Sequence, residues 1–251
     1  MASWVTKTQQ LIAHRGNSWD HPENTRASIL SAIEIGADVV EFDVSVTSDD
    51  VAIALHGPKL QKTTTGQGKS INFTWNEVEE LLSVDSEGRK TGQPIPAVKD
   101  LLCEFGSRSF WNLDVKDLRA VPLIVSMIEE LSLHSRVILS GLSIGKVKEL
   151  SSVYPNINML VNLSRLDKII LGSGILRRQW IIFRFADLSQ YPSVVGINVH
   201  FRYVNKKLVE TIHNLGMQIW TFTVNQLEDV SSLFVLGVDS VTTNRPTMRS
   251  S

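Results

Sequence analysis

The alternation of strand-like and helical segments is the sequence feature that most restricts the fold of this 251-residue chain. Apolar, strand-like runs predict eight strands, at Gln10–Ala13, Val39–Val46, Phe110–Val115, Arg136–Ser140, Ile157–Val161, Val194–His200, Gln218–Thr223 and Ser240–Thr243. Helical patterns lie between most of them, at Asn24–Ile35, Val121–Leu131, Ile144–Val153, Asn205–Leu215 and Gln226–Leu236. Eight strands that alternate with helices predict an α/β protein with the (β/α)8 TIM-barrel fold.

One interval, residues 47–109, interrupts this alternation between the second and third strands. It contains a short strand, two loops rich in Thr or Gly and two small helices, predicted at Val51–Leu55, Thr63–Ser70, Glu87–Pro96, Thr74–Leu82 and Ala97–Phe105. We interpret the interval as a small insertion at one mouth of the barrel. The segment after Thr243 is short, so we expect the eighth helix to be vestigial or missing. We expect residues 1–251 to form a single TIM-barrel catalytic domain, because the sequence contains neither internal repeats nor a low-complexity linker.

Charge and targeting signals exclude several classes of protein. Lys and Arg number 25 against 26 Asp and Glu, and no basic run forms the patch that nucleic-acid binding requires. The single cysteine, Cys103, excludes an internal disulfide and fits a reducing compartment. The N-terminus lacks the apolar core of a secretory signal, and no stretch approaches the roughly twenty apolar residues of a membrane span. We therefore expect a cytoplasmic protein without a transmembrane segment, and its oligomeric state is not indicated.

Two carboxylates, Glu41 and Asp43, lie on the same face of an otherwise apolar strand. Buried at this spacing they repel each other, and one of them would be protonated unless a cation lies between them. Hard divalent ions such as Mg²⁺ or Ca²⁺ prefer oxygen ligands of this kind. The alternative, a strand with a polar outer face, conflicts with the valines around the pair, because parallel barrel strands are covered on both faces.

A second polar set, Asn112, Asp114 and Lys116, repeats this spacing on a later strand. Asp114 would supply a third metal ligand, and Lys116 would offset charge and bind an anion. Taken alone, the run is equally typical of a solvated edge strand. The pairing with Glu41 and Asp43 favours the metal site.

His14, Arg15 and His56 follow apolar runs, and His14 lies at the expected end of the first barrel strand, where barrel active sites form. A guanidinium binds phosphate oxygens in a forked geometry, and two histidines suit a general acid and a general base near neutral pH. With a divalent ion bound and neutral histidines, the whole set carries one net positive charge. A singly charged phosphodiester would neutralise the site.

The sequence resembles the glycerophosphodiester phosphodiesterase family. The matching segments occur in the family's order along the chain: Ile12–Gly16, Pro22–Thr25, Gly36–Val44, His56, Thr64–Gly68, Ile95–Pro96, Asn112–Lys116, Trp220–Asn225 and Gly237–Ser240. Any one segment is a weak signal, whereas their combination is specific.

This resemblance implies a (β/α)8 barrel with a small insertion after the second strand. It implies that Glu41, Asp43 and Asp114 bind a divalent cation, often Mg²⁺ or Ca²⁺, and that His14 and His56 act as acid and base. Arg15 and Lys116 would contact the phosphate and Trp220 would form a wall for the glycerol moiety. The expected substrates are small glycerophosphodiesters, which family members hydrolyse to glycerol 3-phosphate and an alcohol.

Three positions depart from the family pattern, and they keep other functions open. The family usually has Glu at Asp114 and Asp at Gly57 and Asn244. A lysophospholipase D or phosphoinositide-type phosphodiesterase would use similar chemistry on amphiphilic substrates. A metal-dependent sugar or aldol enzyme explains Arg15 poorly. A non-catalytic phosphodiester-binding barrel, which the three departures motivate, predicts affinity for glycerophosphocholine without turnover.

Overall fold

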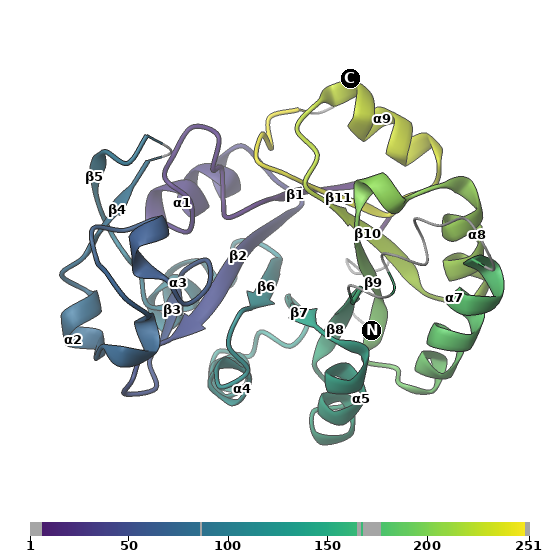
Figure 1. Ribbon diagram of the computed structural model, residues 1–251, viewed down its shortest axis with the longest axis horizontal. Helices are drawn as coiled ribbons and strands as arrows, with labels where there is room; N and C mark the ends of the chain where they lie inside the picture. Colours follow the sequence, from purple (N-terminus) through teal and green to yellow (C-terminus); the bar gives the residue numbers. More distant parts are fainter. Residues whose placement is uncertain (1–6, 86, 165–166, 168–176, 249–251) are drawn as a thin grey trace. The chain divides into compact units, whose positions relative to one another are not determined.

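The computed structural model describes residues 7–85, 87–164, 167 and 177–248. The chain divides into two compact units. We call residues 12–137 with 244–247 the N-terminal unit, and residues 138–243 with 1–11 and 248–251 the C-terminal unit. Figure 1 shows the elements in sequence colours, from purple to yellow.

Parallel strands form the centre of the N-terminal unit. Strand β2 (Val39–Val46) pairs in parallel with β1 (Gln10–Ala13) on one side and with β6 (Trp111–Val115) on the other. All eight residues of β2 are buried, as expected for a strand that is covered on both faces. Helices α1 (Arg26–Glu34) and α4 (Ala120–Glu130) pack against β2 and supply part of this cover.

Capping residues define the limits of helix α1. The side chain of Thr25 accepts a hydrogen bond from the Ser28 backbone, and the Ser28 hydroxyl accepts one from the Thr25 backbone, which forms a capping box. The helix ends before Gly36, whose φ of +74° is the left-handed conformation that commonly follows a helix. The predicted helix Asn24–Ile35 is therefore confirmed with slightly shorter limits.

The interval 47–109 contains more regular structure than the sequence predicted. Strand β3 (Ala52–Ala54) pairs antiparallel with the end of β2, and α3 (Val98–Phe105) matches its prediction closely. The predicted helix Thr74–Leu82 is wrong in length, because only α2 (Trp75–Val78) forms before a strand begins. The 3-10 helices η2 and η3 and the antiparallel strands β4 and β5 complete the interval, at Leu60–Lys62, Ser70–Asn72, Leu82–Val84 and Lys90–Pro94.

A small apolar cluster stabilises this interval. It consists of buried side chains from β3 and the segments that follow it, namely Ile53, Leu55, Leu60, Val78 and Ile95. The apolar surface that these residues bury stabilises the fold by about 25 cal/mol per Å². The cluster gives the end of β3 a defined position, which matters because His56 follows it directly.

In its described residues, the C-terminal unit contains five parallel strands and helices that connect them. The strands are β7 (Val137–Leu142), β8 (Asn158–Asn162), β9 (Val194–His200), β10 (Gln218–Phe222) and β11 (Ser240–Thr243). The helical elements are α5, α7, η4, η5, α8 and α9, at Ile144–Val153, Arg177–Phe185, Ala186–Gln190, Phe201–Tyr203, Lys206–Asn214 and Leu227–Val235. Helix α7 was not predicted, because arginines interrupt its apolar pattern.

The fold class predicted from the sequence, a (β/α)8 TIM barrel, is confirmed. In the part of the chain that the structure describes, eight parallel strands (β1, β2 and β6–β11) alternate with helices. No helix follows β11 in the described residues, which extend to Met248. Within the same described part, no helix combines the length and apolar character that a bilayer crossing requires.

Candidate active site

The register between β2 and β6 brings the predicted carboxylates together. Asp43 lies directly beside Asp114, and Glu41 lies beside Asn112. Because residues two apart share one face of a strand, both carboxylates of β2 point to the same side as Asp114. Carboxylate oxygens of Glu41, Asp43 and Asp114 lie within 4.8 Å of one another. Asp114 therefore reaches the cluster despite a side chain that is one methylene shorter than Glu.

Asp43 is fully buried and contacts three side chains that carry or can carry positive charge. Its Oδ2 atom lies 3.0 Å from Nε of Arg15 and 3.1 Å from Nδ1 of His56, and its Oδ1 atom lies 2.9 Å from Nζ of Lys116. Burial acts to raise the pKa of Asp43, but His56, Lys116 and Arg15 together outweigh it and hold that pKa well below its ordinary value. Asp43 is therefore ionised.

Glu41 has the opposite electrostatic character. Burial, together with the nearby charges of Asp43 and Asp114, raises the pKa of Glu41 well above its ordinary value. One oxygen, Oε2, accepts a hydrogen bond of 2.7 Å from the backbone N–H of Arg15. A carboxylate held among other carboxylates in this way gains most from a nearby cation.

His14 directly follows β1, and a residue far along the chain holds its ring. The Nδ1 atom of His14 lies 2.6 Å from Oδ1 of Asn244, and the Ser18 hydroxyl donates to the same oxygen. Because an amide oxygen can only accept hydrogen bonds, Nδ1 of His14 is the donor and carries the hydrogen. The lone pair of the neutral ring is then on Nε2. Burial and the charge of Arg15 lower the pKa of His14 to about 4, so the ring is neutral at pH 7.

The antiparallel pairing of β3 with β2 brings His56 to the same place. The backbone N–H of Leu55 donates to the carbonyl of Asp43, and the next residue therefore lies beside the Asp43 carboxylate. The imidazole of His56 is oriented by Asp43 on one side and by Nη2 of Arg15, 3.4 Å from Nε2, on the other. The family usually has Asp at the position of Gly57. The ring of His56 nevertheless keeps contacts with Asp43 and Arg15.

The two cationic residues both contact carboxylates of the site. Arg15 contacts Asp43, and its Nη1 atom bonds Glu23 at 2.6 Å. Lys116 contacts both Asp43 and Asp114. Burial acts to lower the pKa of each cation, but the neighbouring carboxylates raise it above its ordinary value. Both residues are therefore cations and are placed to neutralise an incoming anion.

The residues present fit a divalent cation. One oxygen from each of the three carboxylates lies within 4.8 Å of the other two, and two of the three residues are buried. Burial and the charges of Asp43 and Asp114 raise the pKa of Glu41, and a bound dication would favour its ionised form. Oxygen-only ligands of this type suit Mg²⁺ or Ca²⁺ rather than softer metals.

Seven of the eight predicted site residues lie together in the N-terminal unit: His14, Arg15, Glu41, Asp43, His56, Asp114 and Lys116. The eighth, Trp220, belongs to β10 of the C-terminal unit, where it is fully buried and its indole N–H donates to Gln218. The role of Trp220 stays a prediction. His200 was a further candidate because it lies at the end of a strand. Its ring stacks on Phe201 within the same unit.

Sequence reasoning missed the role of Asn24. Its amide donates to Oδ2 of Asp43 at 2.9 Å and accepts from the Asp43 backbone N–H at 3.0 Å. The residue adopts a φ of +58°, which Asn tolerates better than most residues. Its position between Glu23 and the capping residue Thr25 was the available signal.

A barrel fold with buried carboxylates, two histidines and two cations at one site defines an enzyme of the phosphodiester hydrolase class. The model of the glycerophosphoryl diester phosphodiesterase family matches residues 14–248. The chain belongs to this family.

Individual relatives are similar to this protein over nearly the whole length of its chain. A glycerophosphodiester phosphodiesterase from Caldanaerobacter subterraneus subsp. tengcongensis is 27% identical over 243 residues, covering 94% of this chain and 94% of that protein. The structure of an Oleispira antarctica phosphodiesterase in complex with the product sn-glycerol-3-phosphate superposes with a TM-score of 0.78, at 21% identity, over 96% of this chain and 94% of the other. The crystal structure of a glycerophosphodiester phosphodiesterase from Agrobacterium tumefaciens gives a TM-score of 0.76 at 19% identity, over 95% of this chain and 97% of the other. These two structural matches agree with the barrel fold.

Proposed function

We propose that this enzyme hydrolyses glycerophosphodiesters to glycerol 3-phosphate and an alcohol, with a divalent cation bound by Glu41, Asp43 and Asp114. The observation that carries the proposal is the convergence of these three carboxylates beside two histidines and two cations. The named relatives support the same substrate class. When bound, the cation would stabilise the negative charge that develops on the phosphate oxygens.

Arg15 and Lys116 bind the phosphate in this proposal. Each is held in place by Asp43, so the positions of the two cations are fixed before substrate arrives. Preorganised charges of this kind stabilise a transition state without reorganisation. The guanidinium would bind two phosphate oxygens in a forked geometry, and Lys116 would act as a point charge.

His14 is the general base and His56 the general acid in this proposal. The Nε2 atom of His14 carries the lone pair, because Nδ1 is bound to Asn244, and a pKa of about 4 keeps it unprotonated at pH 7. It would accept a proton from the nucleophile, either water or the glycerol 2-hydroxyl. His56 contacts the carboxylate of Asp43, which orients its ring, and would donate a proton to the leaving alkoxide.

The decisive experiment is incubation of the purified protein with glycerophosphocholine and Mg²⁺ or Ca²⁺. Glycerol 3-phosphate is detected with a coupled dehydrogenase, and a parallel reaction contains a chelator. We expect product with metal and little without it. Binding without product would instead identify a non-catalytic barrel. Equal product in the chelated reaction would contradict the metal site.

A further inference from the structure

We propose that the side-chain amide of Asn112 supplies a fourth protein oxygen to the divalent cation of the three-carboxylate site. This proposal rests on the cation of the proposed function and adds a residue to its ligands. Asn112 belongs to the polar set that the sequence places on one face of a strand, and the proposed reaction gives it no role.

The register of two parallel strands places Asn112 beside the carboxylates. On β6 it lies directly beside Glu41 of β2, and two residues further along the strands Asp114 lies beside Asp43. Residues two apart share one face of a strand, and neighbouring strands lie about 4.8 Å apart. The amide of Asn112 is therefore on the same face as the three carboxylates and next to the side chain of Glu41.

The oxygen of this amide is buried and has no partner within the described part of the protein. Asn112 is 3% exposed, and no described residue forms a hydrogen bond with its Oδ1 atom. Burial of a polar atom without a partner costs free energy, and a bound ion is one of the features that explain such an atom in a native protein. By contrast, Asn24 uses both its amide nitrogen and its amide oxygen to bond Asp43. This difference indicates that the Asn112 oxygen is oriented for a ligand.

A cation at this site needs more oxygens than the carboxylates supply. Each of the three residues offers one ligand atom, whereas Ca²⁺ takes about six to eight oxygen ligands, and amide oxygens of Asn are among those it uses. A neutral amide adds an oxygen without adding charge to a site in which Asp43 and Asp114 already help to raise the pKa of Glu41. A bound cation would give the Asn112 oxygen the partner that it lacks.

The test measures cation affinity and cation-free stability of Asn112→Leu, which keeps the approximate shape of the side chain and removes the amide. Isothermal titration is done with Ca²⁺ and, in parallel, with Mg²⁺. For the ion that wild type binds more tightly, we expect a Kd about tenfold higher in the variant. Without the cation, the Tm of the variant should be about 2–4 °C higher, because an apolar group replaces an unpartnered polar atom.

Either of two results overturns the proposal. A Kd within about twofold of the wild-type value would show that the amide bonds only water or protein. A lower Tm of the cation-free variant would show that the amide has a structural partner.

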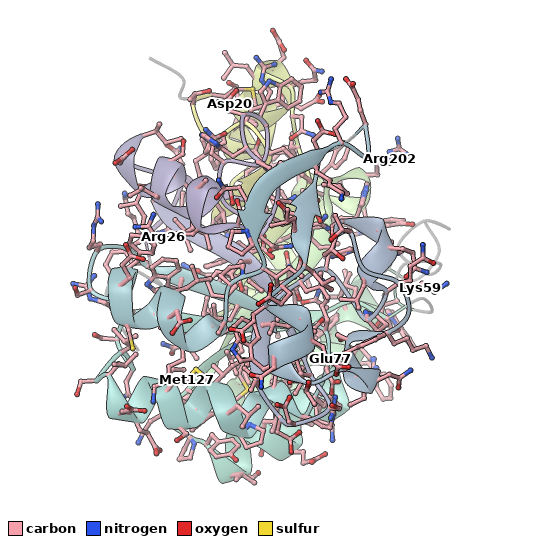
Figure 2. All side chains as sticks on the ribbon, turned by 90° about the vertical axis from the view of Figure 1, so that its left-hand side faces the viewer. Asp20, Arg26, Lys59, Glu77, Met127 and Arg202 are labelled. Carbon is pink, nitrogen blue, oxygen red and sulfur yellow. The ribbon has the colours of Figure 1, made fainter. Side chains whose placement is uncertain are left out.

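Two further variants complete the test. Asn76→Leu makes the same change at an exposed position of helix α2, beside Glu77, which is labelled in Figure 2, and should leave the Kd unchanged. Asn112→Asp keeps an oxygen at the site and should bind the ion at least as tightly as wild type. If Asn112→Leu does not fold, about tenfold weaker binding by Asn112→Asp overturns the proposal.

Equilibrium binding separates this proposal from the proposed function, because it needs no turnover. If wild type binds the ion but releases no glycerol 3-phosphate, the proposed hydrolysis fails, and the comparison of Kd values still tests Asn112. If wild type hydrolyses glycerophosphocholine while Asn112→Leu keeps the wild-type Kd, only the role of Asn112 fails. Absence of binding of both ions in wild type overturns the present proposal.

Discussion

The Nδ1 atom of His14 lies 2.6 Å from Oδ1 of Asn244, although 230 positions separate the two residues in the sequence. The family usually has Asp at this position. An amide orients the ring as a carboxylate would, but it adds no negative charge to stabilise an imidazolium. The hydrogen bond to Asn244 raises the pKa of His14, but by less than a carboxylate would, so burial and Arg15 keep the ring neutral.

Asn244→Asp should raise the pKa of His14, because a carboxylate within hydrogen-bond distance favours the charged ring. We expect the acidic limb of the pH profile of kcat/KM to move upward by about one unit or more. NMR titration of His14 checks the same shift directly. Asn244→Ala should lower kcat and move the limb to lower pH, because the hydrogen bond that it removes raises the pKa of His14. An unchanged limb in Asn244→Asp would show that Asn244 does not control His14.

The low pKa of His14 predicts a loss of stability in mild acid. A histidine is half protonated near pH 6.5 when unfolded and near pH 4 here, so the unfolded chain binds more protons between these values. Stability should therefore fall as pH decreases from about 6.5 to 4, by about 3 kcal/mol at most from this group. Urea unfolding of wild type and His14→Gln at several pH values measures the difference. Parallel curves for the two proteins would contradict this prediction.

Removal of either imidazole should abolish most turnover. His14→Ala and His56→Ala should each lower kcat by about 10²–10⁴-fold, as expected for loss of a general acid or base. His134→Ala, at an exposed histidine outside the site, is the control and should retain wild-type kcat. A loss below about tenfold in either site variant would rule out its acid–base role.

Divalent cations should stabilise the folded protein independently of catalysis. At 100 times the dissociation constant, a bound ion adds about 2.7 kcal/mol to the free energy of unfolding, which raises Tm by several degrees. Asp114→Ala should lose most of this increase, and a chelator should reverse it in wild type. Thermal unfolding with Mg²⁺ and with Ca²⁺ measures both effects. The same increase in Asp114→Ala would remove Asp114 from the ligand set.

Asn24 should contribute to stability through its two hydrogen bonds to Asp43. Asn24→Ala removes both bonds and places Ala at a φ of +58°, so we expect a loss of about 2–4 kcal/mol. Asn24→Gly removes the same bonds but accepts this backbone conformation, and should lose less. Urea unfolding of both variants separates the two contributions. Equal stability of wild type and Asn24→Gly would show that the hydrogen bonds have no net effect.

Local sequence patterns predicted the barrel strands well. The limits of β1, β2, β9 and β11 agree with the prediction, because continuous apolar runs between polar turns leave little freedom. Strand β5 was predicted as part of the loop Glu87–Pro96 and β4 was not predicted, since Lys90–Pro94 has few apolar residues and its pairing partner determines its conformation. Short elements of this kind depend on tertiary contacts that a local pattern does not contain.

The site was predictable in its charged residues but not in their partners. Period-two spacing placed Glu41 with Asp43 on one face, and parallel pairing with β6 added Asp114. The contact between His14 and Asn244 joins segments that are distant in the sequence, so no local residue spacing predicts it. The sequence likewise gave no indication that Arg15, His56 and Lys116 would share one carboxylate.

This shared carboxylate determines how substitutions in the site will combine. Asp43 contacts Arg15, His56, Lys116 and Asn24 at 2.9–3.1 Å. Loss of any one partner changes the electrostatic balance that the other three experience, so their energetic effects will be coupled rather than independent. Double-mutant cycles through Asp43 should therefore give large interaction energies, and a phenotype at this position will reflect the whole network at once.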